Sequence, residues 1–143
     1  MRVATAWIRV VPAVLIMGTI FFLSHQPGDE LQLPQVPGVD KVAHLVAYGA
    51  LGAAVLFAAG ERKRYRPGAA ACVTVCFCIL YGVSDEVHQS FVPGRDASLA
   101  DLVADTLGAS LLAAAWYVKG RRDSRLAGKG SGLLAPGNGR IRS

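Results

Sequence analysis

The chain has 143 residues, of which 52% are hydrophobic and only 17% are charged. Its mean hydropathy of +0.38 is high for a protein whose surface is solvated by water. The apolar residues form four blocks, each close to the ~20 residues that a helix needs to cross a bilayer. These blocks take up more than half of the chain and exclude a separate soluble catalytic domain. The composition therefore predicts an all-α polytopic membrane bundle with four transmembrane helices.

The first apolar block runs from Trp7 to Leu23. Arg9 lies near its beginning, where the guanidinium can reach back to the lipid headgroups. Pro12 lies inside the block, and such prolines are tolerated in membrane helices. A cleaved signal peptide also begins with basic residues and an apolar run, but the residues after Leu23 offer no small-x-small cleavage site. We therefore expect an uncleaved membrane anchor.

The other three blocks are Val42 to Ala59, Ala69 to Val83 and Leu99 to Val118. The third block contains all three cysteines, and their C-x3-C-x-C spacing is not the C-x2-C of zinc sites or redox dithiols. We interpret these cysteines as small apolar fillers. The blocks predict a membrane domain over residues 1–118 and a basic, disordered cytoplasmic tail over residues 119–143.

The positive charges predict the orientation of the bundle. The chain carries fifteen Lys and Arg residues and a net charge of +5. All but Lys41 and Arg95 precede the first block or lie near its beginning, follow the second block or follow the fourth. The positive-inside rule then places both termini in the cytoplasm and residues 24–41 and 84–97 outside. Disorder beside an anionic leaflet explains the basic tail, so we expect no nucleic-acid partner.

Most of the unusual polar residues fall on the outer side of this topology. All four predicted helices contribute to this cluster, and it includes all three histidines. Six carboxylates against Lys41 and Arg95 give a formal excess of four negative charges, which partial burial makes unfavourable. Protonated histidines, protonated carboxylates or a bound divalent cation would compensate this excess.

Some members of the cluster have structural explanations. Asp40 precedes an apolar run, as a helix N-cap does. Ser98 and Asp101 fit a capping box at the start of the fourth block. For Asp40 and Asp101, a role mainly as a helix cap and a role in the site are equally good explanations. Gln89 can serve as an interfacial hydrogen-bonding group, and Arg95 can meet lipid phosphate.

Asp105 resists such an explanation. It lies seven residues after Ser98, which is about 10 Å down the helix. An ionised carboxylate facing lipid at that depth would cost up to ~3 kcal/mol. Asp105 must therefore face the bundle and find a partner or a proton.

Two helical spacings bring histidines next to carboxylates. His44 lies one turn after Asp40 and one turn before Tyr48, so an Asp40–His44 hydrogen bond is geometrically available, although a structural core histidine is the alternative. Asp85 and His88 share a face if the third helix continues to residue 89. Residues 93 and 94, Pro and Gly, then turn the chain back.

At these residues the chain resembles the VanZ-like family of small multispanning bacterial membrane proteins. The most specific match is the D-E-x-H-Q-x-F-x-P-G-R block within residues 81–95. Further matches are residues 23–28, residues 40–44 with Tyr48, and Ser98, Asp101, Asp105, Gly108 and Ala109. His25 stands where a second serine is common in the family, and Asp105 where asparagine is frequent. The resemblance implies a helical membrane protein and a link to teicoplanin susceptibility, but it supplies no reaction.

Three functions fit this cluster. The first is an intramembrane enzyme that acts at the outer leaflet of the cell membrane on a lipid or lipid-linked envelope precursor, by acid–base or metal-assisted hydrolysis. The second is a non-catalytic protein that binds a lipid or drug or modulates a partner. The third is a proton- or cation-coupled carrier, for which four helices are few.

The two versions of the enzyme differ in their central group. Without a metal, Asp85 or Glu86 orients His88 as a general base, and Arg95 stabilises negative charge on the substrate. With a divalent cation, mixed nitrogen and oxygen ligands are available, because His44 and His88 each share a helix face with an acidic residue. Such pairs also arise from ordinary hydrogen bonding, so the cofactor is left open.

Twelve residues make up the predicted site. We predict the reacting groups to be His44, Asp85, Glu86, His88, Arg95 and Asp105. We predict the substrate-binding or supporting groups to be Asp40, Lys41, Tyr48, Gln89, Ser98 and Asp101.

Overall fold

The structure is a computed structural model, and it describes residues 2–28, 38–59 and 67–133. In these residues the backbone forms four helices: α1 (Arg2–Ser24), α2 (Val39–Ala59), α3 (Pro67–Gln89) and α4 (Leu99–Leu133). Each contains a stretch that is long and apolar enough to cross a membrane. The predicted all-α bundle of four membrane-spanning helices is confirmed, and the chain is a multi-pass membrane protein.

All four helices extend beyond the apolar blocks that predict them, and the largest extensions are at the C-terminal ends of α3 and α4. α3 continues past Val83 to Gln89, because no glycine or proline interrupts the polar residues that follow the block. α4 continues past Val118 to Leu133, so the first part of the predicted tail is helical. Residues 134–143 of that tail lie outside the described residues.

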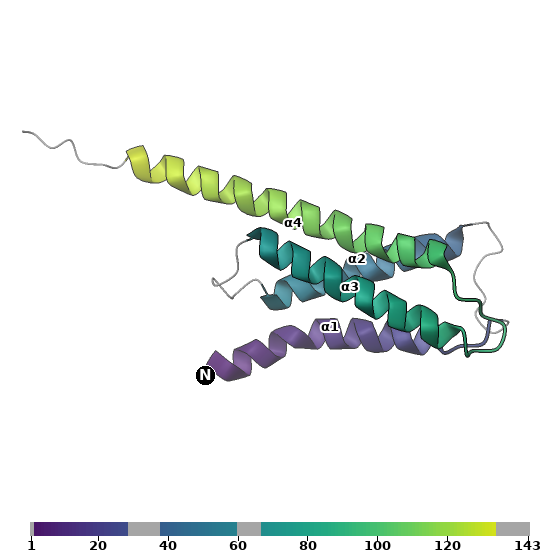
Figure 1. Cartoon of the computed structure of the whole chain (residues 1–143). Coiled ribbons are helices and arrows are strands. Elements are labelled where there is room, and N and C mark those ends of the chain that lie inside the picture. The colour runs from purple at the N-terminus through teal and green to yellow at the C-terminus, as the bar shows by residue number, and fades with distance from the viewer. Residues whose placement is uncertain (1, 29–37, 60–66, 134–143) are drawn as a thin grey trace, which may run out of the picture.

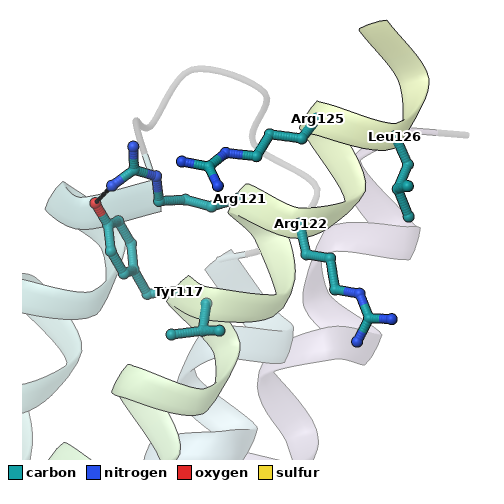
Figure 2. Close-up of a pocket in the computed structure, with 6 residues that line it drawn as sticks. Tyr117, Arg121, Arg122, Arg125 and Leu126 are labelled. Atoms are coloured by element: carbon teal, nitrogen blue, oxygen red, sulfur yellow. Dashed lines mark hydrogen bonds between the residues drawn. The ribbon is translucent and has the colours of Figure 1, made fainter. Parts of the chain in front are cut away.

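The C-terminal part of α4 is strongly basic. Arg121, Arg122 and Arg125 line an open hollow with Tyr117 and Leu126 (Figure 2). The guanidinium of Arg121 donates a hydrogen bond to the Tyr117 hydroxyl over 3.3 Å and lies 5.7 Å from the centre of the Tyr117 ring. Basic side chains at this end of the bundle are what the positive-inside rule leads us to expect of a cytoplasmic flank.

The helices pack as a bundle in which α2 and α3 lie between α1 and α4 (Figure 1). α4 packs most extensively against α2 and next against α3, whereas α1 contacts α2 and α3 and, within the described residues, does not contact α4. The Tyr81 hydroxyl on α3 donates a hydrogen bond to the carbonyl oxygen of Met17 on α1 over 2.7 Å. α3 is therefore tied to α1 as well as packed on α4.

Small residues allow α2 and α4 to approach closely. A Cβ atom at Gly108 would overlap the carbonyl oxygen of Leu45, and one at Gly52 would lie 3.3 Å from the Cα of Ala109. Close approach of backbones at small residues is the usual way in which membrane helices gain van der Waals contact. The pairing of these two helices sets the separation of the groups that they carry toward the site.

The outside of the bundle is apolar, as contact with lipid requires. Phe22 on α1, Leu80 on α3 and Leu111 on α4 are each more than half exposed. Water-soluble monomers rarely expose contiguous apolar surface on this scale, whereas lipid tails solvate it. The interior contains smaller patches of buried residues such as Tyr48 and Leu51.

The three cysteines are free thiols. Cys72 and Cys76 are exposed on the apolar outside of α3, and Cys78 is buried in the core. Cys78 lies on a different side of α3 from Cys72 and Cys76, so the three thiols do not face one another as the ligands of one metal site would.

The segments that follow α1 and α3 meet at one end of the bundle, which is on the right in Figure 1. The Gly28 amide donates a hydrogen bond to the Pro93 carbonyl oxygen over 3.2 Å, and a Cβ atom at Gly28 would overlap the carbonyl of Gly94. Gly94 has a φ of 73°, a left-handed conformation that favours glycine. The predicted turn at residues 93 and 94 therefore lies directly against the segment that follows α1.

Candidate functional site

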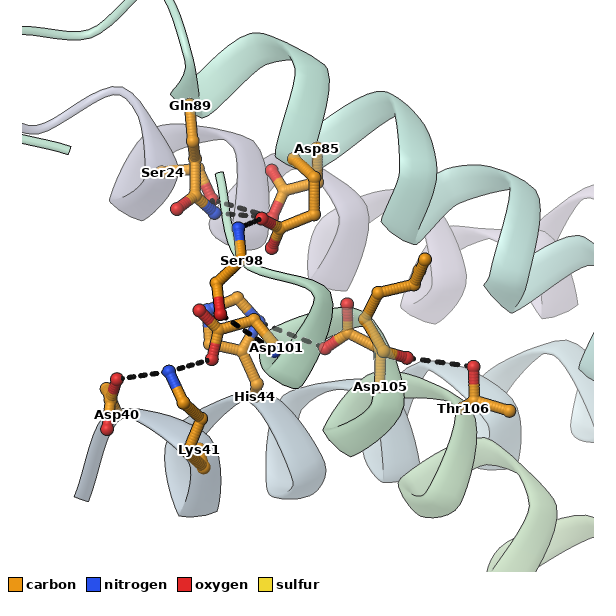
Figure 3. Close-up of polar contacts among 12 residues, drawn as sticks. Ser24, Asp40, Lys41, His44, Asp85, Gln89, Ser98, Asp101, Asp105 and Thr106 are labelled. Atoms are coloured by element: carbon orange, nitrogen blue, oxygen red, sulfur yellow. Dashed lines mark hydrogen bonds and ion pairs between the residues drawn. The ribbon is translucent and has the colours of Figure 1, made fainter. Parts of the chain in front are cut away.

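The polar residues of the predicted outer cluster meet at this same end of the bundle (Figure 3). They come from the last turns of α1 and α3, from the beginning of α2, and from the beginning of α4 with the segment before it. The buried polar side chains at this end are Ser24, Asp85, Glu86, Gln89, Asp101 and Asp105. Four segments far apart in the sequence thus contribute to one polar site.

The innermost pair of the site is His44 on α2 with Asp105 on α4. The Nδ1 atom of His44 lies 3.0 Å from Oδ1 of Asp105, and Asp105 is fully buried. A carboxylate only accepts, so Nδ1 is the donor, and a neutral His44 then carries its lone pair on Nε2. The structure therefore places Asp105 inside the bundle with a partner.

The Asp40–His44 hydrogen bond that helical spacing made available is not formed. Lys41 instead lies between two carboxylates, with its Nζ atom 2.6 Å from Asp40 and 2.7 Å from Asp101. This ion-pair set joins the first turns of α2 and α4. Asp40 and Asp101 are therefore the ion-pair partners of Lys41, and the imidazole of His44 pairs with Asp105 instead.

Asp85 on α3 is held by two hydrogen-bond donors. Its Oδ2 atom accepts from the Ser24 hydroxyl over 2.9 Å and from Nε2 of Gln89 over 3.0 Å. Gln89 also donates to the Ser24 oxygen over 3.2 Å. Gln89 was predicted as a supporting residue of the site, whereas Ser24 was not among the predicted residues, because nothing in a single sequence indicates that α1 supplies a donor to a carboxylate on α3.

Glu86 replaces one half of the predicted capping box at the start of α4. Its Oε2 atom accepts the Ser98 amide over 2.6 Å, and the Ser98 hydroxyl accepts the Asp101 amide over 3.4 Å. The second half of the predicted box, a bond from Asp101 back to the Ser98 amide, is thus taken over by Glu86. The Oε1 atom of Glu86 is buried and has no hydrogen-bond partner among the described residues.

His88 does not pair with Asp85, although the two share a stretch of α3. Its Nε2 atom lies 3.3 Å from Nδ1 of His25, and its ring stacks on Phe21 with centroids 4.7 Å apart. The i, i+3 spacing left the orientation of the two side chains open. In the structure Asp85 turns into the bundle, and His88 forms a rim pair with His25.

Arg95 closes the site from the loop before α4. Its Nη2 atom donates a hydrogen bond to the Leu23 carbonyl oxygen over 3.2 Å, near the end of α1. Its Nε atom is buried with no hydrogen-bond partner in the described part of the chain. The guanidinium therefore keeps unused donor capacity on the wall of the site.

Gly82 is a site residue that sequence reasoning missed. A Cβ atom at this position would lie 3.0 Å from Oδ2 of Asp105 and 3.5 Å from the ring of Tyr48. The absence of a side chain therefore makes room for the buried carboxylate and for Tyr48, whose hydroxyl has no hydrogen-bond partner among the described residues. The only signal in the sequence was a glycine one helical turn before Glu86.

A cavity of about 150 Å³ lies at the centre of these groups. Its polar lining consists of Ser24, Asp40, His44, Tyr48, Asp85 and Arg95. Four apolar residues of α1 and α2 complete it. Five of the twelve predicted site residues thus line one space. Asp105 contacts the lining residue His44, and Glu86 accepts the Ser98 amide at the start of α4.

Comparison with known proteins places the chain in a family. No curated protein and no solved structure gives a significant match. The family model described as VanZ/LLP1 matches residues 9–120, which include the spans of α2 and α3, most of the spans of α1 and α4, and every residue of the site. The chain therefore belongs to the VanZ/LLP1 family of membrane proteins.

Proposed function

We propose that this protein binds the phosphate-bearing headgroup of a lipid or lipid-linked envelope precursor at the outer leaflet of the cell membrane and hydrolyses it. The observation that carries the proposal is the cavity beside the buried His44–Asp105 pair, which also presents Arg95. A carboxylate-oriented imidazole and a guanidinium are the groups that activate water and hold a phosphate.

The size of the cavity limits what it can enclose. About 150 Å³ accommodates a phosphate group with a few water molecules, at ~30 Å³ for each water. Sites that enclose drug-sized ligands are usually ~300–1,000 Å³. The cavity therefore favours a headgroup over a whole glycopeptide antibiotic, and a link to teicoplanin susceptibility would act through the envelope lipid.

The roles follow from the hydrogen bonds. Arg95 is anchored by Leu23 and retains a free Nε donor for a phosphate oxygen. Asp105 fixes the ring of His44, so Nε2 is the atom that faces an activated water. Nε2 of His44 takes a proton from that water as the water attacks phosphorus, which forms one P–O bond and breaks the bond to the leaving group. His44 then gives the proton to the oxygen of the leaving group.

A non-catalytic role in binding the same headgroup is the second candidate. The observation that favours it is the complete engagement of Oδ2 of Asp85 by Ser24 and Gln89, which is typical of a carboxylate that shapes a site. The two candidates share the cavity and Arg95. They differ in whether a bond of the lipid is broken.

The experiment expresses the wild type, His44→Gln and Arg95→Gln at matched levels in a susceptible host and measures teicoplanin susceptibility. The purified proteins are also incubated in vesicles with a polyprenyl diphosphate, and released phosphate is measured. We expect His44→Gln to lose at least tenfold in phosphate release, and Arg95→Gln to bind the lipid more weakly.

The matched control is Asp96→Asn, because Asp96 is an exposed acid in the same loop as Arg95. It should behave as the wild type. Lipid binding without phosphate release in the wild type would support the second candidate. Neither binding nor release, with unchanged susceptibility in all variants, would reject both.

A further inference from the structure

We propose that His44, Asp85 and Glu86 together bind one divalent first-row cation, such as Zn²⁺ or Mn²⁺. A nitrogen of His44 and one carboxylate oxygen from each of the other two residues all lie within 4.8 Å of one another. The inference rests on the proposed function in one respect: with Nε2 of His44 bound to the cation, the cation rather than the imidazole would activate the water that attacks the headgroup.

The side chains around these donors already have the arrangement of a second coordination shell. His44 donates Nδ1–H to the buried carboxylate of Asp105 over 3.0 Å. Histidine ligands of metals almost always donate their other ring N–H to a carboxylate or carbonyl, which orients the ring and makes the free nitrogen more basic. Asp85 is likewise fixed through Oδ2 by Ser24 and Gln89, which leaves Oδ1 as its donor.

Glu86 supplies the observation that points to a missing ligand. It is only 7% exposed, and its Oε2 atom is held by the Ser98 amide. Its Oε1 atom is buried with no hydrogen-bond partner within the described residues. An unpaired buried carboxylate oxygen is costly, and a cation bound between Glu86, Asp85 and His44 removes that cost.

The charges around the cavity also favour a cation. Lys41 is already paired with Asp40 and Asp101, so it does not neutralise the carboxylates deeper in the site. Asp85, Glu86 and Asp105 then face one imidazole and the guanidinium of Arg95, so negative charge remains in excess. A divalent cation reduces this excess of negative charge without requiring a protonated carboxylate.

The donor set selects among cations. One imidazole with two carboxylates suits Zn²⁺ or Mn²⁺, whereas Ca²⁺ and Mg²⁺ prefer oxygen ligands alone. Bonds of ~2.1 Å need donor atoms ~3–4 Å apart, so the three side chains have to close by about one ångström. The space beside them accommodates water as the remaining ligand.

The test uses the full-length protein in detergent, purified without a polyhistidine tag and stripped with EDTA. It is titrated with ZnCl₂, MnCl₂, MgCl₂ and CaCl₂, and bound metal is counted by mass spectrometry after gel filtration. We expect a single equivalent of Zn²⁺ or Mn²⁺, a higher melting temperature with either, and at least tenfold weaker binding of Mg²⁺ and Ca²⁺.

Glu86→Gln keeps an oxygen for the Ser98 amide but removes a negative ligand, so we expect it to bind at least tenfold more weakly. His44→Gln should do the same. His88→Ala and Asp96→Asn are the controls and should bind as the wild type. Loss of binding in His88→Ala alone would move the metal to the rim pair with His25 and overturn the proposal, as would no saturable binding.

A spectroscopic measurement keeps the proposal testable if a variant does not fold. Electron spin echo spectroscopy of Mn²⁺ bound to the wild type should show the signal of a coordinated imidazole nitrogen. The same signal should persist in a His25→Ala/His88→Ala double variant. No nitrogen signal would refute the assignment. Metal binding is measured without substrate, so a bound metal with no phosphate release would contradict the proposed function and leave this inference standing.

Discussion

At the scale of single residues, each buried carboxylate of the site is kept in place by a partner from another part of the chain. Asp105 is held by His44, Asp85 by Ser24, and Glu86 by the Ser98 amide. Gln89, which also donates to Asp85, is a further partner within the described residues, and it lies at a helical i, i+4 position from its carboxylate. The site therefore exists only when all four helices have assembled.

Asp105→Leu tests whether the innermost carboxylate serves function or stability. The substitution removes a buried charge from an apolar helix, which favours insertion by up to ~3 kcal/mol, but it leaves His44 unpaired at a cost of ~1–3 kcal/mol. Because these effects are similar in size, we expect the variant to accumulate in the membrane near the wild-type level while phosphate release is lost. Accumulation is measured by quantitative blotting of membrane fractions.

The comparison for that measurement is Asp101→Leu, which removes a buried carboxylate from the same helix but leaves His44 and Asp105 paired. If Asp105→Leu fails to accumulate and Asp101→Leu is harmless, Asp105 is mainly a structural residue. The assignment of the His44–Asp105 pair to catalysis would then be wrong.

Gly82→Ala tests the room that the site requires. A Cβ atom there would lie 3.0 Å from Oδ2 of Asp105 and 3.1 Å from Leu102, so the carboxylate has to shift. Overpacking of this kind costs about 1–3 kcal/mol. We expect a lower melting temperature in detergent and reduced phosphate release, whereas Gly18→Ala, with nothing within 4 Å of the added atom, should lower neither.

At the scale of helices, the apolar blocks identified every membrane span, because the bilayer fixes the length and composition that a span needs. They failed at the end of α3, where residues 84–89 are helical although all of them except Val87 are polar. Periodicity also predicted partners within one helix, such as Asp40 for His44 and His88 for Asp85. His44 instead pairs with Asp105 on α4, and His88 with His25 directly after α1. The spacing of residues along one helix does not indicate which helices pack together.

Gly108→Ala tests the closest contact between helices. An added Cβ atom would overlap the backbone carbonyl oxygen of Leu45, which cannot move without moving α2. We therefore expect a larger fall in melting temperature than for Gly82→Ala, together with loss of cation binding, because His44 and Asp105 lie on the two helices that separate. An unchanged melting temperature would show that α2 and α4 pack differently.

At the scale of the whole molecule, the polar and basic groups lie at opposite ends of the bundle. The site gathers the end of α1, the end of α3 and the starts of α2 and α4, whereas Arg121, Arg122 and Arg125 lie toward the far end of α4. The start of α1 lies at that same far end (Figure 1). This separation is compatible with the orientation predicted from charge, which places the site outside and the basic end in the cytoplasm.

Thiol labelling in intact cells tests this orientation. In a background in which Cys72, Cys76 and Cys78 are replaced by serine or alanine, single cysteines are introduced at exposed positions. Ala97 lies in the loop beside the site and Arg122 at the basic end, and both are exposed. Because Val92 in the same loop is buried, it is unsuitable as a reporter.

We expect a membrane-impermeant maleimide to label Ala97→Cys in intact cells, and to label Arg122→Cys only after the membrane is opened. Leu80→Cys, on the apolar outside of α3, should resist the reagent in both conditions because lipid covers it. The positive-inside rule gives this direction, since all but two of the basic residues lie on the predicted cytoplasmic side. Labelling of Arg122→Cys in intact cells, with Ala97→Cys protected, would invert the bundle and move the proposed site to the cytoplasmic leaflet, where a different lipid substrate would have to be sought.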